Sequence, residues 1–431
     1  MKIGIVGSGI SGLMAASELH KNGHQVTVFE AGDSIGGHVK TISYTFEEGE
    51  PPLILEAGTT VFDPVLMHRN IGAKAKELAI PHRRLDMAFT FINRENDIAW
   101  TMYPPIENSL IKDLKSLAKF ELSALKNESF VKQNLLLREL RRFFRDMRRV
   151  SVDTNYGQVG LEQFVGEQGY SKLLQDAFIQ PNLLFWWGVT SDQASNCSIQ
   201  VIADSFNIAP RKEQYIFTRG WMDFMKAIAA PFKEDIRINS KVDSVVRNKG
   251  QIDLTANNTT ETYDHVIFST PPNVVDELLK DKTSEEIRNL RSFSTTTTEV
   301  ILHTDSSWMP KNDKWALGNL VQDERGTFIT HWVGGYDPRK PKVFVSWGED
   351  FTSAISPKYV ILRREFVRTL PTVGYYQACH QINNLQGDKG IWYCGAHVDA
   401  LDPEGKGIAP SLWHENAFLS GIAVANRIIN I

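Results

Sequence analysis

Residues 2–19 read KIGIVGSGISGLMAASEL, and this stretch decides the fold. A short β-forming run leads into a glycine-rich turn, after which apolar residues recur at helical spacing. The turn has the G-x-G-x-x-G spacing of a dinucleotide-binding βαβ unit, with Gly7, Gly9 and Gly12 at its three glycine positions. The N-terminus of the predicted helix then offers oriented N–H groups to phosphate oxygens.

A second predicted strand, residues 25–29, ends in Glu30, which lies 18 residues beyond Gly12. A carboxylate at this place accepts hydrogen bonds from a ribose hydroxyl and repels an additional 2′-phosphate. A glycine-rich turn in another kind of α/β protein is the alternative explanation. The succession of strand, helix, second strand and acid favours the dinucleotide site.

Two further small-residue segments favour a flavin dinucleotide over NAD. The pair Gly36-Gly37, followed by His38, would bring a second backbone segment to the pyrophosphate. The turn at Gly58, Thr59 and Thr60 follows the apolar run 53–55 and would pass close to a flat ring. Taken alone, each segment is also compatible with a simple loop.

From Ile3 through Glu30 to residues 36–41, the sequence resembles the superfamily of flavin amine oxidases, phytoene desaturases and protoporphyrinogen oxidase. Members usually carry Arg after the paired glycines. Here His38 takes that place, as in a subgroup of FAD/NAD-binding proteins associated with cyclopropane fatty-acyl synthases. The stretches 179–187, 300–310, 392–396 and 414–416 resemble the same subgroup.

The resemblance implies an α/β fold in which a Rossmann-type FAD-binding domain is interleaved with an α+β substrate domain. We expect residues 1–85, 208–282 and 388–431 to form the FAD-binding domain, and residues 86–207 and 283–387 the substrate-binding domain. Such interleaving places one cleft between the two domains. FAD is expected to bind non-covalently.

The motifs and the resemblance together predict the cofactor contacts. In the superfamily, the residue matching Val242 places its backbone at the adenine, and the C-terminal segment approaches the flavin. The predicted cofactor-binding residues are Gly7, Gly9, Ile10, Ser11, Gly12, Glu30, Ala31, Gly36, Gly37, His38, Gly58, Thr59, Thr60, Val242, Gly395, Glu415 and Asn416.

No catalytic residue is assigned from the sequence. His397 and His414 flank segments expected beside the flavin, so either is a candidate for moving a substrate proton, although a structural role is the favoured reading of each. Lys340 and Lys342 lie in the region where amine oxidases carry a lysine, but the surrounding sequence does not match. The His and Cys residues lack zinc spacing, so no metal site is predicted.

Charge and composition narrow the range of partners. The 431 residues carry 47 Lys and Arg against 51 Asp and Glu, so no overall positive field indicates nucleic acid. Three cysteines without a C-x-x-C pair are typical of the reducing cytoplasm. The basic amphipathic stretch from Arg138 to Arg149 fits peripheral contact with anionic lipid, or an ordinary helix with one solvated face, which is the favoured alternative. The sequence does not predict an oligomeric state.

These observations predict an FAD-dependent oxidoreductase that oxidises, desaturates or isomerises an apolar, lipid-like substrate by hydride transfer to flavin N5. A large number of aromatic and apolar residues supports an apolar substrate. They are residues 178–187, Trp221, Trp332, Tyr336 and Trp347. The alternative enzyme is a flavin oxidase acting on an amine or a specialised secondary metabolite. A non-catalytic flavin-binding protein and an NAD dehydrogenase are the remaining hypotheses.

Overall fold

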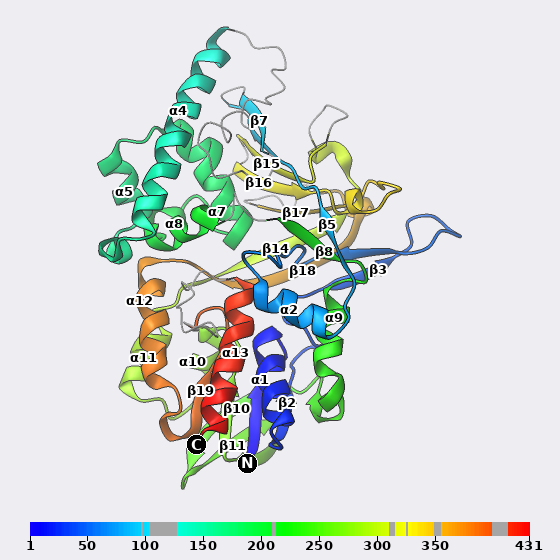
Figure 1. Ribbon diagram of the computed structural model, residues 1–431, viewed down its shortest axis with the longest axis vertical. Helices are drawn as coiled ribbons and strands as arrows, with labels where there is room; N and C mark the ends of the chain where they lie inside the picture. The colour runs from blue at the N-terminus through cyan, green and yellow to red at the C-terminus, as the bar shows by residue number, and fades with distance from the viewer. Residues whose placement is uncertain are drawn as a thin grey trace.

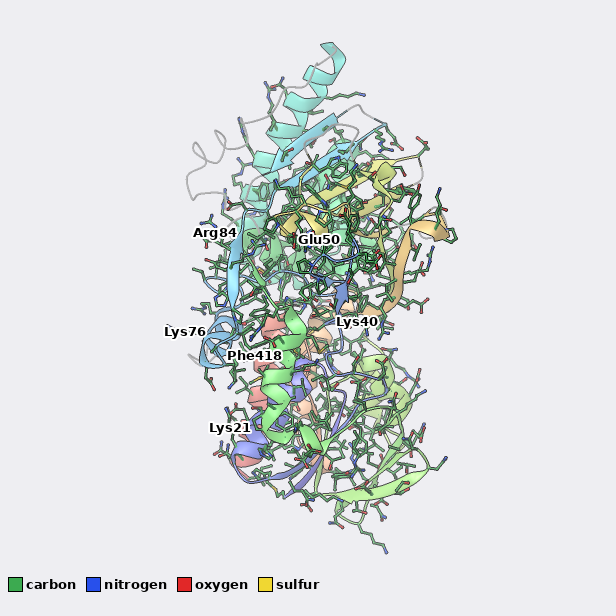
Figure 2. All side chains as sticks on the ribbon, turned by 90° about the vertical axis from the view of Figure 1, so that its right-hand side faces the viewer. Lys21, Lys40, Glu50, Lys76, Arg84 and Phe418 are labelled. Atoms are coloured by element: carbon green, nitrogen blue, oxygen red, sulfur yellow. The ribbon has the colours of Figure 1, made fainter. Side chains whose placement is uncertain are left out.

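The computed structural model describes residues 1–95, 98–102, 127–208, 213–309, 315–324, 326–348, 355–398 and 413–431. It has a lower part, built around a parallel sheet, and an upper part, built around a larger sheet with helices beside it (Figure 1). Both termini lie at the bottom of the lower part. Figure 2 shows the same arrangement from the side, with Lys21 and Phe418 in the lower part and Arg84 in the upper part.

The lower part is centred on a parallel sheet whose strands come from distant stretches of the chain. Its order is β19-β13-β1-β2-β9, and all four pairings are parallel. The strands are β1 (Lys2–Val6), β2 (Gln25–Phe29), β9 (Ile236–Arg237), β13 (His265–Phe268) and β19 (Ile391–Tyr393). Their near-continuous apolar runs are buried, as expected for a parallel sheet covered on both faces.

Helices cover one face of this sheet, and a small antiparallel sheet lies against the other. Helix α1 (Ile10–Lys21) packs on α13 (His414–Ile429) and on α9 (Trp221–Ala229). The small sheet consists of β10 (Val242–Asn248), β11 (Gln251–Ala256) and β12 (Thr259–Tyr263). It packs closely on β1, because a Cβ built at Gly4 would lie 3.3 Å from side-chain atoms of Leu254 and Tyr263.

One stretch of this region has a sequence pattern that indicates a different structure. Residues 236–239 alternate apolar and polar side chains, which is typical of a half-buried hairpin strand, but β9 pairs in parallel with β2, with Ile236 opposite Val28. Asn239 has a positive φ of 50°, and this turn ends the strand. The alternation is the same for a hairpin strand and for a short edge strand, so the sequence pattern does not distinguish them.

The upper part is built on a sheet in which seven strands of the described residues take the order β18-β14-β17-β16-β15-β6-β7. All neighbours pair in antiparallel fashion except β15 and β6, which are parallel. The strands are β6 (Phe89–Asn93), β7 (Ile98–Met102), β14 (Thr295–His303), β15 (Gly318–Asp323), β16 (Gly326–His331), β17 (Phe344–Gly348) and β18 (Val360–Thr369).

Helices lie beside this sheet, and shorter elements connect the two parts (Figure 1). The helices of the upper part are α4 (Asn127–Val150), α5 (Leu161–Gln168), α6 (Lys172–Leu174), α7 (Gln180–Trp187) and α8 (Ile199–Ile208). The remaining helices are α2 (Arg69–Glu77), α10 (Pro272–Leu278), α11 (Ser284–Leu290) and α12 (Val373–Gln381). Two strand pairs complete the fold, β3 (Thr41–Tyr44) with β4 (Leu53–Glu56), and β5 (His82–Leu85) with β8 (Gln214–Phe217).

Helix α4 is amphipathic, as the sequence pattern predicts. Leu140, Phe143 and Met147 are buried in the core of the upper part, while Arg141 and Arg145 are exposed. The apolar face of α4 therefore packs against the protein core, so only the charged face would be available for contact with lipid. Within the described residues, no helix is both long and apolar enough to cross a membrane.

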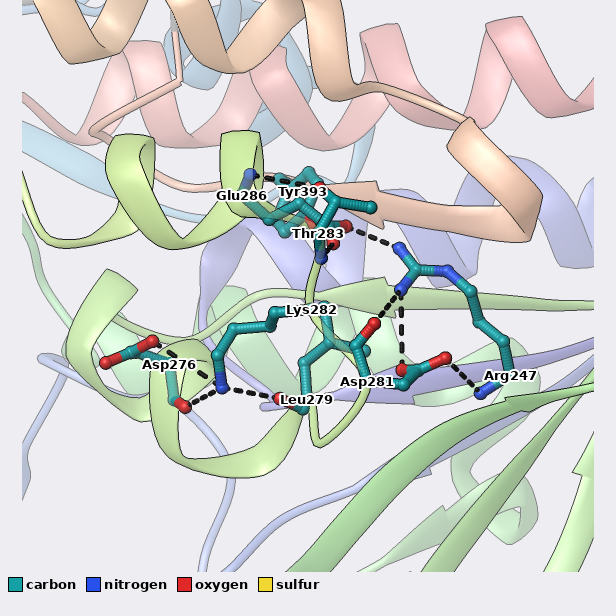
Figure 3. A network of polar contacts seen from close by, with 8 residues as sticks. All are labelled: Arg247, Asp276, Leu279, Asp281, Lys282, Thr283, Glu286 and Tyr393. Carbon is teal, nitrogen blue, oxygen red and sulfur yellow. Dashed lines mark hydrogen bonds and ion pairs between the residues drawn. The ribbon is translucent and has the colours of Figure 1, made fainter.

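A buried polar network joins the small sheet to α11 and β19 (Figure 3). Glu286, of which 1% is exposed, accepts hydrogen bonds from the Arg247 guanidinium, from Tyr393 Oη at 2.8 Å and from the backbone N–H of Thr283 at 2.8 Å. Thr283 Oγ1 in turn accepts from the N–H of Glu286, which completes a capping box at the start of α11. A second carboxylate, Asp281, lies 3.4 Å from Arg247.

Candidate active site

The glycine-rich turn between β1 and α1 has one side open to a ligand. A Cβ built at Gly12 would lie 2.2 Å from Gly7 O, and Gly7 itself has a φ of +101°. The fold therefore requires both glycines. Gly9 differs, because its φ of −66° suits any residue and a Cβ there meets nothing within 4 Å. The described protein contacts do not require a glycine at Gly9, and its small size leaves room for a bound group.

The second glycine pair, Gly36 and Gly37, lies beside this turn, and we call the turn and the pair together the cradle. Gly36 N donates to Ser8 O at 3.0 Å, and a Cβ at Gly37 would lie 3.2 Å from Gly9 Cα. Gly37 is exposed, and no side chain of the described residues caps the N-terminus of α1 at Gly9. Two backbone segments and an uncapped helix N-terminus, where Ile10 and Ser11 begin α1, thus meet at one open place, as binding of a pyrophosphate requires.

Glu30 lies beside the cradle at the carboxyl end of β2. Its Oε2 accepts from Ser8 N at 3.1 Å and from Ser8 Oγ at 2.5 Å, and its Oε1 accepts from Gly32 N at 2.8 Å. The neighbouring Ala31 is exposed. The carboxylate is therefore held in place where the βαβ motif puts the acid that receives a ribose hydroxyl.

A third segment, residues 58–60, packs against the second, residues 36–38. A Cβ at Gly58 would lie 2.0 Å from His38 O, and Thr59 N donates to the same oxygen at 3.0 Å. Thr60 Oγ1 donates to Gly58 O at 3.1 Å. Thr59 Oγ1 lies 2.7 Å from Nε2 of His414, the first residue of α13. The structure thus brings His38, residues 58–60 and the start of the C-terminal helix together.

The His397 side chain packs against the backbone of the loop that follows β19, at Gly395. Gly395 has a φ of +146°, and a Cβ there would lie 2.6 Å from His397 Cε1. The His397 ring packs edge-on against Phe293, and burial lowers the pKa of His397 to about 4. His397 is therefore neutral at physiological pH, and it shapes the loop at Gly395.

The side chains of Glu415 and Asn416, both predicted as cofactor-binding residues, form hydrogen bonds with neighbouring protein segments, and a contact of their backbone with the cofactor stays a prediction. Glu415 accepts hydrogen bonds from Asn70 N at 2.7 Å, Asn70 Nδ2 at 2.7 Å and Ile71 N at 3.2 Å. It therefore caps α2, whose own N-cap residue supplies no side-chain hydrogen bond. Asn416 Nδ2 donates to Ala396 O at 2.7 Å and to Val398 O at 2.8 Å. Both side chains are buried because they hold the surrounding backbone.

Replacing Glu415 with alanine is expected to lower the free energy of unfolding by about 1–2 kcal/mol, because the first N–H groups of α2 lose their acceptor. Chemical denaturation of the apoprotein measures this loss. Glu48→Ala, which removes an exposed carboxylate, is the control and should change stability little. Equal stability of the two variants would contradict the capping role.

Val242 lies at the start of β10, where the register with β11 shifts between Val242 and Ser244. Its side chain is buried, so only its backbone is available to a ligand. The predicted place of this backbone at an adenine stays a prediction.

β18, one edge strand of the upper sheet, contacts the predicted cofactor-binding segments. Val367 O lies 3.0 Å from His38 Nε2, and the Phe366 ring packs edge-on against the His38 ring at 5.6 Å. Phe366 Cζ would also lie 3.3 Å from a Cβ at Gly58. β18 therefore joins the predicted substrate region to the predicted flavin region.

Aromatic side chains of α7 gather near the same place. Trp186 and Trp187 lie 6.1 and 6.5 Å from the ring of Trp413, which is the N-cap residue of α13. Phe185 stacks on Trp347 at 5.9 Å. Trp221 is buried in the core of the lower part, where its ring lies 5.7 Å from the His414 ring and its Nε1 donates to Thr60 O at 3.2 Å.

Two buried polar groups of this region were not found from the sequence. Burial raises the pKa of Glu56 to about 8, although its carboxylate accepts from Trp221 N at 2.8 Å and from Thr41 Oγ1. Tyr336 Oη lies 2.5 Å from His331 Nε2, and burial lowers the pKa of His331 to about 3. Trp221 and Glu56 lie far apart in the chain, so no local pattern indicates their contact, whereas His331 and Tyr336 are separated by five positions.

A family model described as flavin containing amine oxidoreductase matches residues 10–377, which is most of the sequence. The chain belongs to this family. Flavin amine oxidoreductases are enzymes that use FAD, which agrees with the prediction of an FAD-dependent oxidoreductase. The cradle described above fits that cofactor.

Two curated relatives match short segments of this flavin amine oxidoreductase. Tryptophan 2-monooxygenase of Agrobacterium vitis is 44% identical over 64 residues, which are 15% of this chain and 8% of the relative. A 4,4'-diapophytoene desaturase of Staphylococcus aureus (strain Newman) is 36% identical over 58 residues, which are 13% of this chain and 11% of the relative. The matches thus span about a tenth of these relatives' length.

Solved structures confirm the predicted fold class of this flavin amine oxidoreductase over the whole chain. A putrescine oxidase bound to putrescine matches with a TM-score of 0.70 and 15% identity, covering 100% of both chains. A CLA-producing fatty acid isomerase from P. acnes matches with a TM-score of 0.62 and 13% identity, covering 100% of this chain and 98% of the other. At these identities the likeness concerns the fold alone.

Proposed function

We propose that this flavin amine oxidoreductase binds FAD non-covalently and oxidises, desaturates or isomerises an apolar, lipid-like substrate. The observation that carries the proposal is the contact of Phe366 and Val367 with the His38 and Gly58 segments, next to the aromatic residues of α7. An apolar wall beside the flavin excludes water and favours hydrocarbon.

The residues present fit FAD. The open side of Gly9, the adjoining Gly37 and the N-terminus of α1 would receive the pyrophosphate, and Glu30 would receive the ribose. Bound FAD supplies the acceptor for the two electrons and the hydride at N5. Cys394 lies fully buried at the end of β19, and burial raises the pKa of its thiol to about 12, which supports non-covalent binding.

The chain's own residues would position and shield the substrate. Trp186 and Phe185 are half-buried and present apolar surface near the start of α13. His414 is held by Thr59, so its ring has a fixed orientation at the predicted flavin segment. His397 is neutral and lies behind Gly395, so we assign it a supporting role instead of proton transfer.

The alternative is a flavin oxidase that acts on an amine or a specialised secondary metabolite. The family description and the likeness to putrescine oxidase support it. Lys340 is exposed and has a positive φ of 52°, and Lys342 lies 5.9 Å from the centre of the Trp315 ring. Neither lysine lies in a described contact with the predicted flavin segments.

The absorption spectrum of the purified protein tests the cofactor, and anaerobic titration tests the substrate. We expect a yellow protein that releases FAD on heating and is bleached by a fatty acyl lipid but not by amines of equal chain length. Bleaching by amines alone would establish the alternative. A colourless protein that cannot be reconstituted with FAD would overturn the proposal.

A further inference from the structure

Arg368 is a half-buried cation of β18 at the border between the two parts of the molecule. Its backbone is paired with Thr296 of β14, and it directly follows Val367, whose carbonyl contacts His38. Its side-chain stem packs on the end of α7, because Arg368 Cδ would lie 3.2 Å from a Cβ at Gly188. The aliphatic part of the side chain is therefore held by protein.

The charge of Arg368 has no partner among the described residues. On the same strand, Arg363 pairs with Glu299 at 3.1 Å, and Arg364 is exposed to water. Arg247, whose side chain is 10% exposed, has the carboxylates of Asp281 and Glu286. A guanidinium that is largely withdrawn from water and has no anion is costly.

The guanidinium retains its charge and lies near the predicted flavin segment. Burial lowers the pKa of Arg368 to about 10, so the side chain is still a cation at neutral pH. The His38 residue is exposed, but its ring contacts Phe366 and Val367 O. Desolvation by the surrounding protein, with the Arg368 charge as the second cause, lowers the pKa of His38 to about 4. The Arg368 charge therefore acts at the His38 segment.

We propose that Arg368 binds the carboxylate of the substrate, so that the substrate of this site is an apolar carboxylic acid. A single guanidinium matches one carboxylate through two parallel hydrogen bonds. The half-buried aromatic residues of α7, which ends at Gly188, would then receive the hydrocarbon chain. This inference rests on the proposed function, because it places the anion beside the predicted flavin.

Binding of three ligands of equal length tests the assignment: octanoate, 1-octanol and octylamine. Each is titrated into FAD-loaded protein and into apoprotein by calorimetry, and the flavin spectrum is recorded in parallel. We expect wild type to prefer octanoate over 1-octanol, and Arg368→Gln to weaken octanoate binding by about 10- to 100-fold without weakening 1-octanol. Arg368→Lys should retain part of the preference, since it keeps the charge but loses the paired geometry.

Arg364→Gln removes an exposed positive charge from the same strand and is the matched control, which should bind octanoate as wild type does. Unchanged octanoate binding by Arg368→Gln, with a wild-type melting temperature, would overturn the proposal. A loss of FAD affinity in Arg368→Gln, with octanoate binding intact in the apoprotein, would assign the arginine to the cofactor. Arg368-dependent octanoate binding by a wild-type protein that takes up no FAD would overturn the proposed function alone.

Discussion

Replacing Gly9 with alanine is expected to leave the melting temperature of the apoprotein unchanged and to lower its affinity for FAD by about 10- to 100-fold. The backbone at Gly9 is in a conformation that alanine adopts without strain, and the added methyl group meets no protein atom within 4 Å. The methyl group would instead occupy the space where the pyrophosphate approaches the backbone. Fluorescence titration with FAD and thermal unfolding without it measure the two effects separately.

Two glycine substitutions serve as controls for this prediction. Gly166→Ala also places a methyl group in open space, but on α5 of the upper part, so it should leave FAD affinity unchanged and raise stability by up to about 1 kcal/mol, because alanine favours the helix. Gly12→Ala should destabilise the apoprotein itself, since the new Cβ would lie 2.2 Å from Gly7 O. If Gly9→Ala binds FAD as wild type does, the cradle is not the cofactor site.

The second large effect is expected for Glu286→Ala, which should lower the free energy of unfolding by about 3–5 kcal/mol. The substitution leaves the buried Arg247 with Asp281 alone and removes the acceptor of Tyr393 Oη (Figure 3). Denaturant unfolding of the apoprotein measures the loss. Glu285→Ala, one position earlier and exposed, is the control and should cost much less. Equal losses in both variants would contradict the role of the network.

The same network predicts a dependence of stability on pH. Desolvation acts to raise the pKa of Glu286, but hydrogen bonds from Arg247, Thr283 and Tyr393 outweigh it and hold this pKa below its ordinary value of 4.5. Because the pKa is lower in the folded state, the stabilisation is complete above pH 4.5 and is lost as the pH falls through the folded pKa. Unfolding of Glu286→Gln should therefore depend less on pH in this acid range than unfolding of wild type.

The features that the sequence predicts well are those set by neighbouring residues. Gly7, Gly9 and Gly12 act within one turn, so their spacing is enough to indicate the strand, the turn and the helix, and the structure leaves the turn open at Gly9. Glu30 follows in the next strand of the same unit, and the structure holds its carboxylate beside that turn. The βαβ unit therefore needs no information from the rest of the chain.

The features that the sequence misses depend on contacts between distant residues. Glu415 caps α2, which lies far away in the sequence, so the sequence does not indicate what its acidic side chain does. Arg368 is one of several arginines on β18, and only the folded chain shows that it is half-buried without an anion among the described residues. A pattern along one strand carries no information about which charges face it from other elements.

The order of strands in the lower sheet has a consequence for biosynthesis. β1 and β2 are made before the other strands of this sheet, whereas β13, on the far side of β1, follows the helices of the upper part, and β19 follows its last strand. Helix α13, which covers α1, comes last. Such non-local pairing is slow and leaves an apolar strand edge uncovered in the nascent chain. Capture of the cofactor is thus a late event, and a bound flavin would mark molecules whose synthesis and folding are complete.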